Sequence, residues 1–174
     1  MESSIPRLRP VTARDALFLF RLFVSTRVRE PAPVPAPHEQ EALFRQQFDE
    51  QASWWSQEYP DASFDIVEVG GLAAGRLYVH RARQDHRIVD IALQPTHRGR
   101  GIGTTLLQAV MLEADRAGKL VSLHVSVFNP ARRLYERLGF VQVEDRGAYL
   151  LMVRTVVAVS SHRCHGPMVR GERS

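Results

Sequence analysis

The residues whose types and spacing suggest chemistry most directly form a short loop rich in glycine and arginine. Glycines at alternate positions let the backbone of such a loop approach a ligand without interference from a Cβ atom. The helix expected to follow begins with N–H groups that lack intrahelical partners and favour an anion, and arginines add donors suited to phosphate oxygens. The loop therefore predicts a pyrophosphate-binding site, with a glycine-rich turn carrying surface arginines as the alternative. Its residues are Arg98, Gly99, Arg100, Gly101, Ile102 and Gly103, followed by Thr104.

Two common phosphate-binding motifs do not fit this loop. A P-loop requires Gly-Lys followed by Ser or Thr, and the only lysine of the chain is Lys119. A dinucleotide-binding fingerprint requires a third glycine where Thr104 stands, within a strand–helix unit at the start of the chain. The loop is therefore of neither type.

Strands and helices of regular pattern surround the loop and must position it. Apolar residues at helical spacing follow it, and the next stretch alternates between apolar and small or polar side chains, as in a strand with one buried face. Asn129 and Pro130 are suited to begin a further helix, which carries Tyr135. The expected elements are a strand over 87–93, a helix over 103–117, a strand over 120–127, a helix from Asn129 to Gly139, and a closing antiparallel pair over 141–144 and 149–153.

The first half of the chain predicts a strand, two helices and a hairpin. Between the helices, prolines alternate with small residues, which favours an ordered loop beside a substrate site over an SH3-type ligand. Trp54 and Trp55 are interpreted as core aromatics, with the wall of a substrate pocket as the alternative. The expected elements are a strand over 7–10, a helix over 16–24 begun by Thr12 and Asp15, a proline segment from Pro31 to Pro37, a helix over 38–58, and strands over 64–69 and 72–80 joined by Gly70 and Gly71.

Composition predicts one globular domain over residues 1–154 and a flexible tail over 155–174. The 174 residues are 44% hydrophobic and 24% charged, and the single cysteine excludes a disulfide framework. No apolar run approaches a membrane span and no signal sequence is recognised, so a cytoplasmic location is expected. The net charge of +4 comes partly from the tail, and nucleic-acid binding is not expected. In the tail, His162, Cys164 and His165 are interpreted as mobile residues rather than a metal site, and no metal is expected.

The spacing of Arg98, Gly101 and Gly103 resembles the acyl-CoA-binding motif of the GNAT (Gcn5-related) N-acetyltransferase superfamily. The similarity continues through the order of elements from about residue 64 to 153, and includes Asn129, Tyr135 and the run Leu138-Gly139-Phe140. The resemblance implies an α/β fold: a mixed, mostly antiparallel sheet with helices on both faces and two central strands that splay apart. These strands would be 87–93 and 120–127, with the pantetheine of acetyl-CoA lying between them.

The resemblance also implies which residues carry the site. Acetyl transfer to an amine needs a hydrogen-bond donor for the thioester carbonyl, an acid for the leaving thiolate and a base for the acceptor. Tyr135 stands where family members place the acid, besides packing in its helix. Family members with a glutamate as base would carry it at the position of Arg87 or of His124, so this chain departs from both patterns. We expect His124 to act as the base, and a purely structural role for this histidine is an equally weighted alternative. Asp90 and Glu58 are further candidates for the base. The residues expected to bind the cofactor are Ile91, Ala92 and Leu93 through their backbone, the loop from Arg98 to Thr104, and Asn129 and Arg132.

The function implied is acetyl-CoA-dependent N-acetyltransfer to a primary amine of a small molecule, peptide or protein. Cys164 lies outside the matched region, so direct transfer in a ternary complex is expected rather than an acyl-cysteine route. The alternative is an acyl-CoA-binding module of the same fold without catalysis, suggested by Arg87 at the glutamate position. A monomer or a homodimer is expected.

Overall fold

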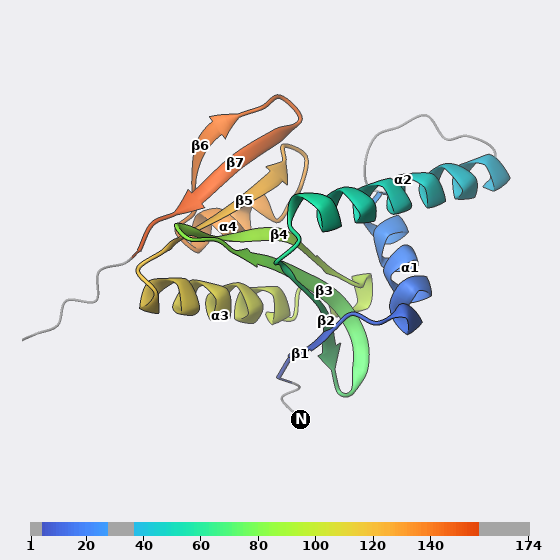
Figure 1. Cartoon of the computed structure of the whole chain (residues 1–174), viewed down its shortest axis with the longest axis horizontal. Coiled ribbons are helices and arrows are strands. Elements are labelled where there is room, and N and C mark those ends of the chain that lie inside the picture. The colour runs from blue at the N-terminus through green and yellow to red at the C-terminus, as the bar shows by residue number, and fades with distance from the viewer. Residues whose placement is uncertain (1–4, 28–36, 157–174) are drawn as a thin grey trace, which may run out of the picture.

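A computed structural model describes residues 5–27 and 37–156 of the chain. They form a seven-stranded sheet with the strand order β1-β2-β3-β4-β5-β7-β6 and four α-helices (Figure 1). The elements are β1 Arg7–Pro10, α1 Ala16–Arg27, α2 Pro37–Glu58, β2 Ser63–Val69, β3 Leu72–Arg81, β4 Asp85–Leu93, α3 Ile102–Arg116, β5 Leu120–Ser126, α4 Arg132–Arg137, β6 Val141–Asp145 and β7 Tyr149–Arg154, with short 3-10 turns at Ala13–Asp15 and Pro95–His97.

The expected fold class is confirmed: the sheet is mixed, mostly antiparallel and flanked by helices on both faces. Among the strands of the described residues, only β4 and β5 pair in parallel; each of the other neighbouring pairs is antiparallel. Parallel neighbours need a long crossover, and here α3 provides it. Because β4 and β5 run in the same direction, both end at the same edge of the sheet, where α3 and α4 begin.

One face of the sheet packs on α3. Leu106, Leu107 and Val110 of this helix belong to the main apolar cluster, together with Val79 of β3 and Leu123 of β5. The amphipathic spacing read from the sequence therefore points this helix stripe into the core. Tyr135 of α4 joins the same cluster.

The opposite face of the sheet carries α1 and α2 (Figure 1). Side chains alternate between faces along a strand, so Tyr78 faces away from the α3 side that Val79 lines. The ring of Trp55 in α2 meets that of Tyr78 at 5.5 Å, edge to face, and Phe23 of α1 meets Phe48 of α2 in the same way. Trp55 is thus a core residue as interpreted, whereas the neighbouring Trp54 is 54% exposed.

The element boundaries follow the sequence patterns to within about two residues, with two larger differences. The first helix begins with a 3-10 turn, where the Asp15 carboxylate accepts hydrogen bonds from the backbone N and Oγ1 of Thr12, and it continues to Arg27. Regular helix after β5 begins only at Arg132, because Asn129 makes a tight turn first: its Oδ1 accepts a hydrogen bond from the N–H of Ala131.

Some sequence predictions fall outside the part of the chain that the structure describes. These are the prolines at 31, 33 and 35 and almost all of the tail, including Cys164; Pro37 is the first residue of α2. Within the described residues, no helix is long and apolar enough to cross a membrane.

Two β-bulges shape the central strands. The first puts the extra residue Ala74 into β3, beside Gly75, where a Cβ atom would collide with the carbonyl oxygen of Ala92 in β4. The second puts the extra residue Val89 into β4, since Val79 pairs with Ile88 and Tyr78 with Asp90. Bulges of this kind bend a strand and increase its twist.

Candidate active site

The candidate site is a V-shaped opening between β4 and β5. Their parallel pairing runs from Asp85 with Leu120 to Ile88 with Leu123 and extends no further within these fully described strands. The bulge at Val89 follows at once and turns β4 away, while β5 continues alongside β7. The backbone from Val89 to Leu93 therefore lines the opening, which confirms the expected splayed strands.

The glycine loop lies at the wide end of this opening, between β4 and α3. Gly99 and Gly101 have positive φ angles of 71° and 79°, which side chains with a Cβ rarely adopt. Gly101 is the N-cap of α3, and the hydrogen bond from Thr105 N to Gly101 O is the first of the helix. The N–H groups of the first turn, from Ile102 to Thr104, precede that bond and have no intrahelical acceptor. No acidic residue stands in that turn. This is a backbone arrangement suited to an anion.

The two arginines of the loop differ in role. The guanidinium of Arg98 donates to the carbonyl oxygen of Leu93 at 2.8 Å and to Ser25 Oγ at 3.3 Å. It ties the loop to the end of β4 and to α1. Arg100 is exposed at the loop surface.

Asn129 and Arg132 lie at the same edge of the sheet, after β5. Asn129 is exposed and uses its side chain to form the turn before α4. Arg132 makes an ion pair with Glu136, one helical turn away, at 3.0 Å. Both residues thus border the wide end of the opening on the β5 side, across from the glycine loop, which follows β4.

Tyr135 is buried beneath this edge. Its side chain is 6% exposed and its ring packs against that of Phe140 at 5.9 Å. Burial, and secondarily the negative charge of Asp90, raise the pKa of the Tyr135 hydroxyl far above its usual range. The hydroxyl is therefore protonated at neutral pH and able to donate a proton.

Asp90 follows the bulge and is held by a buried cation. Its Oδ2 lies 2.6 Å from Nε of Arg76, whose side chain is only 4% exposed. The Arg76 guanidinium also lies 5.0 Å from the ring of Trp55 and 5.4 Å from that of Tyr78. Burying a cation is costly unless it is paired, so this ion pair fixes Asp90 beside the opening. No sequence pattern marked Arg76, because it stands among apolar strand residues.

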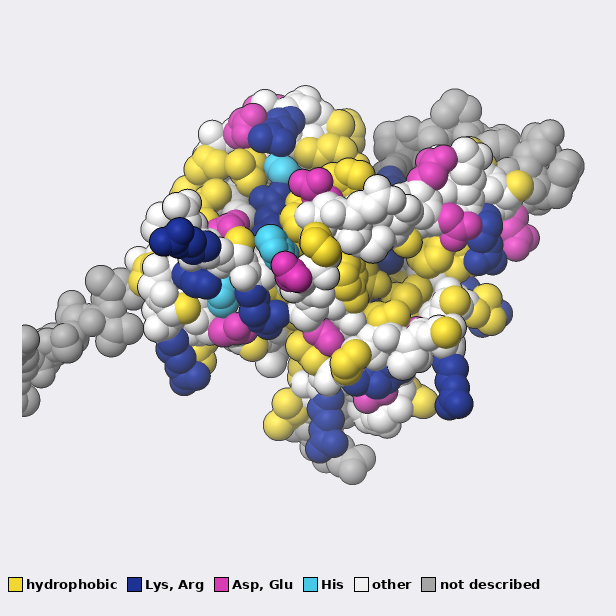
Figure 2. Space-filling view, viewed as in Figure 1, with side chains coloured by type: hydrophobic (Ala, Val, Ile, Leu, Met, Phe, Trp, Pro, Cys, Tyr) yellow, Lys and Arg dark blue, Asp and Glu magenta, His cyan; other side chains and the backbone are white. Residues whose placement is uncertain are grey.

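His124 is exposed on β5, on the face opposite to α3, and contacts Arg87 of β4. The Arg87 guanidinium donates to His124 Nδ1 from one nitrogen and to Ser122 Oγ from another, at 3.1 Å. Figure 2 shows Lys/Arg and His side chains next to one another on this face, between the β6–β7 hairpin and α2. The lone pair that a base would use at Nδ1 is thus already occupied. Glu58, the other reserve base, is exposed at the end of α2.

No metal site accompanies these groups within residues 5–27 and 37–156: no three His, Cys, Asp or Glu side chains there are placed to hold an ion. The tail residues His162, Cys164 and His165 lie outside that part.

Sequence relatives carry acetyltransferase names. A stretch of 84 residues is 36% identical to a Bacillus subtilis (strain 168) protein named as a putative ribosomal protein bS18-alanine N-acetyltransferase, covering 47% of this chain and 56% of that protein. A stretch of 111 residues is 32% identical to the uncharacterized N-acetyltransferase MJ1207 of Methanocaldococcus jannaschii, covering 59% of this chain and 49% of that protein. The chain thus spans about half the length of the curated relatives it matches.

Solved structures share the fold. PH1933 from Pyrococcus horikoshii OT3 superposes with a TM-score of 0.67 at 19% identity, and the PaiA N-acetyltransferase from Thermoplasma acidophilum, crystallised with coenzyme A, with a TM-score of 0.66 at 18% identity. Each match covers 86% of this chain and 98% of the other. The profile of the acetyltransferase (GNAT) family matches residues 20–140, which include the opening, the glycine loop and Tyr135. The chain belongs to the acetyltransferase (GNAT) family.

Proposed function

We propose that residues 1–154 form an N-acetyltransferase domain that moves an acetyl group from acetyl-CoA directly to a primary amine. The observation that carries this proposal is the opening between β4 and β5 with the glycine loop at its wide end. An opening of this kind fits a long, narrow molecule with phosphates at one end. Acetyl-CoA would supply the thioester, and coenzyme A in the Thermoplasma neighbour supports this class of ligand.

Residues around the opening would bind the cofactor and supply a proton to its leaving sulfur. N–H groups of Ile102 to Thr104 would bind phosphate oxygens, and backbone N–H groups from Ile91 to Leu93 would donate to the thioester carbonyl. As the amine nitrogen bonds to the carbonyl carbon and the carbon–sulfur bond breaks, Tyr135 would give its proton to the sulfur. Its burial supports this role, because the neutral phenol is the form that donates.

The acceptor must lose a proton near the narrow end of the opening. Asp90 is held there by Arg76 through one carboxylate oxygen, and it can receive this proton directly or through water. For the nature of the acceptor, the similarity to the Bacillus protein favours the amine of a protein or peptide.

A second candidate, an acyl-CoA-binding module without catalysis, is favoured by one observation. His124, the expected base, and Asp90, one of the two residues in reserve, already have cationic partners, Arg87 and Arg76. The two candidates differ in turnover and agree in ligand binding.

The test is calorimetric titration with acetyl-CoA, NAD and ATP, followed by thiol-release assays with a panel of primary amines. Binding of acetyl-CoA alone, with turnover of at least one amine, is the expected result. Binding without turnover of any amine would establish the second candidate, and absence of acetyl-CoA binding would refute both.

A further inference from the structure

Arg87 and His124 lie where the opening between β4 and β5 closes. Arg87 pairs with Ser122 in the parallel ladder, and the next pair, Ile88 with Leu123, is its last. His124 is therefore the first residue of β5 beyond the ladder. Since Ile88 and Leu123 face α3, their neighbours in sequence, Arg87 and His124, lie on the other face, at the narrow end of the opening.

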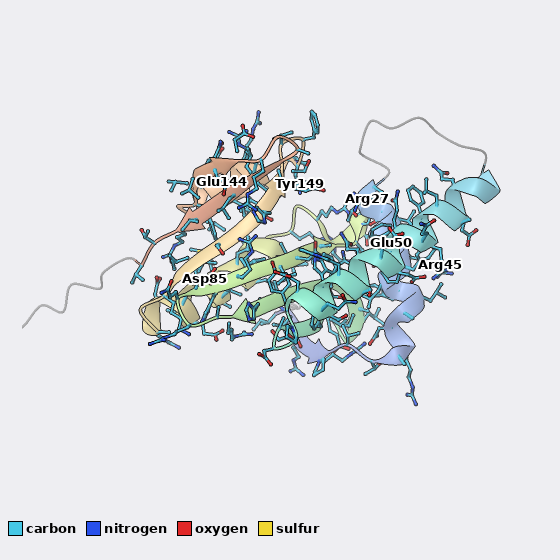
Figure 3. All side chains as sticks on the ribbon, turned by 45° about the horizontal axis from the view of Figure 1, so that its top comes forward. Arg27, Arg45, Glu50, Asp85, Glu144 and Tyr149 are labelled. Atoms are coloured by element: carbon cyan, nitrogen blue, oxygen red, sulfur yellow. The ribbon has the colours of Figure 1, made fainter. Side chains whose placement is uncertain are left out.

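A chain of hydrogen bonds fixes the orientation of His124. Ser122 Oγ donates to Asp85 Oδ2 at 2.5 Å, Arg87 donates to Ser122 Oγ, and a second Arg87 nitrogen donates to His124 Nδ1. Asp85 lies at the beginning of β4 (Figure 3). A guanidinium has no acceptor, so Nδ1 must accept with its lone pair and the proton of the neutral ring is on Nε2. The exposed imidazole thus presents an N–H donor.

The surrounding charges keep this ring neutral. Partial burial lowers the pKa of His124, the cations Arg87 and Arg146 lower it further, and Glu144 acts in the opposite direction. Glu144 itself accepts a hydrogen bond from Arg146 at 2.9 Å, on the β6–β7 hairpin (Figure 3). The carboxylates of this cluster therefore already have partners, and the side chain left to meet a ligand is a donor.

The reacting end of the cofactor would lie close to this donor. An arm that starts at the glycine loop and follows β4 backwards from Leu93 to Val89 spans about 3.3 Å per residue. It would bring the thioester carbonyl to the backbone N–H of Ile91 and the amine of the acceptor next to Asp90 and Val89. His124 stands directly across the opening from Val89, by extension of the register of Ile88 with Leu123.

We propose that His124, held by Arg87, donates a hydrogen bond to an oxygen atom adjacent to the amine of the acceptor. The preferred acceptor is then the α-amino group of an amino-acid residue, whose carbonyl lies two bonds from the nitrogen, rather than an alkylamine. Arg87 is a positioning residue, because it sets the tautomer of His124. This inference rests on the proposed acetyl transfer.

The first test compares two amines of similar size, L-alaninamide and 3-methyl-2-butylamine, by the ratio of their kcat/KM values. In His124→Leu this ratio falls about five- to tenfold from that of the wild type, the usual effect of losing one hydrogen bond. The different basicity of the two amines cancels, because the same pair is used for each protein. In His124→Gln the ratio stays within about threefold, since the side-chain oxygen can accept from Arg87 while the amide nitrogen donates.

A base would behave differently in the same assay. If His124 removed the proton, His124→Gln and His124→Leu would lower kcat for both amines by about 100-fold or more and leave the ratio unchanged. That result would overturn the inference and leave the proposed acetyl transfer intact. Absence of transfer to any amine would instead refute the proposed function.

The second test reads the tautomer without turnover. In nitrogen-15 NMR spectra, the His124 signals, assigned by their loss in His124→Gln, show Nε2 protonated and Nδ1 not, with titration below the usual pH of about 6.5. Arg87→Met brings the titration back towards that pH and populates both tautomers, while Arg83→Met, in the exposed turn before β4, changes neither. Protonation of the wild-type ring at Nδ1 would contradict the positioning role of Arg87, as would a tautomer and titration of His124 that do not change in Arg87→Met.

Discussion

Replacement of Gly101 by alanine tests whether the glycine loop binds the cofactor in the conformation seen here. Gly101 has a φ of 79°, and no atom lies within 4 Å of the place that a Cβ would take, so the side chain meets no neighbour and the effect comes from the backbone. Gly118, at the other end of α3, offers a matched control, because its φ is 65° and the space around it is equally open. The two variants carry the same strain, and only one of them lies in the proposed site.

The expected magnitudes follow from that strain. A residue with a Cβ in the left-handed region costs about 1–2 kcal/mol. In the free protein, each variant loses up to this amount of stability, about 2–4 °C in Tm per kcal/mol for a domain of this size. Strain that the free protein already carries leaves binding unchanged. If instead the free Gly101→Ala loop relaxes out of the left-handed region, its stability is kept, the loop must regain that conformation to bind acetyl-CoA, and the Kd rises by up to about 5- to 30-fold. In Gly118→Ala the Kd stays at the wild-type value.

Calorimetric titration with acetyl-CoA measures the Kd, and thermal unfolding of the free proteins measures the Tm. The reasoning is refuted if Gly101→Ala keeps both the Tm and the acetyl-CoA affinity of the wild type while Gly118→Ala shows the expected loss in Tm. Equal weakening of binding in both variants would instead mean that strain anywhere along α3 reaches the site.

Three further predictions concern buried groups. Tyr135→Phe lowers kcat by about 100-fold or more while the Kd for acetyl-CoA stays nearly constant, measured by thiol release and calorimetry; unchanged turnover would remove the hydroxyl from the mechanism. Asp90→Asn destabilises the fold by about 3–5 kcal/mol in urea unfolding, because it leaves the buried Arg76 cation unpaired, and the double variant with Arg76→Met recovers part of this loss; an Asp90→Asn protein as stable as the wild type would contradict the role of the pair. Burial lowers the pKa of His86, whose Nδ1 has no hydrogen-bond partner among the described residues, so its folded form binds protons less readily than its unfolded form. The free energy of unfolding is therefore independent of the protonation of His86 above about pH 6.5 and decreases as the pH falls below that value. In His86→Leu, the free energy of unfolding changes less with pH between about pH 7.5 and 5.5.

The order of strands and helices around the site could be predicted from the sequence because it rests on local signals. Alternation over residues 120–127 and helical spacing after Gly103 record which side of each element is buried, and these match β5 and α3. The loop was equally predictable, since a positive φ favours glycine at Gly99 and Gly101. The separation of β4 and β5 was predicted from the resemblance to the family and not from a local pattern.

Only the tertiary structure decided which partner each charged side chain takes. Arg87 and His124 are 37 residues apart in sequence, and Arg98 and Ser25 are 73 apart. Their contacts depend on the register of β4 against β5 and on the packing of α1, which no local pattern encodes. For this reason no local pattern indicated that Arg98 contacts Leu93 and Ser25 or that Arg87 occupies Nδ1 of His124, and the packing of distant segments decided both contacts.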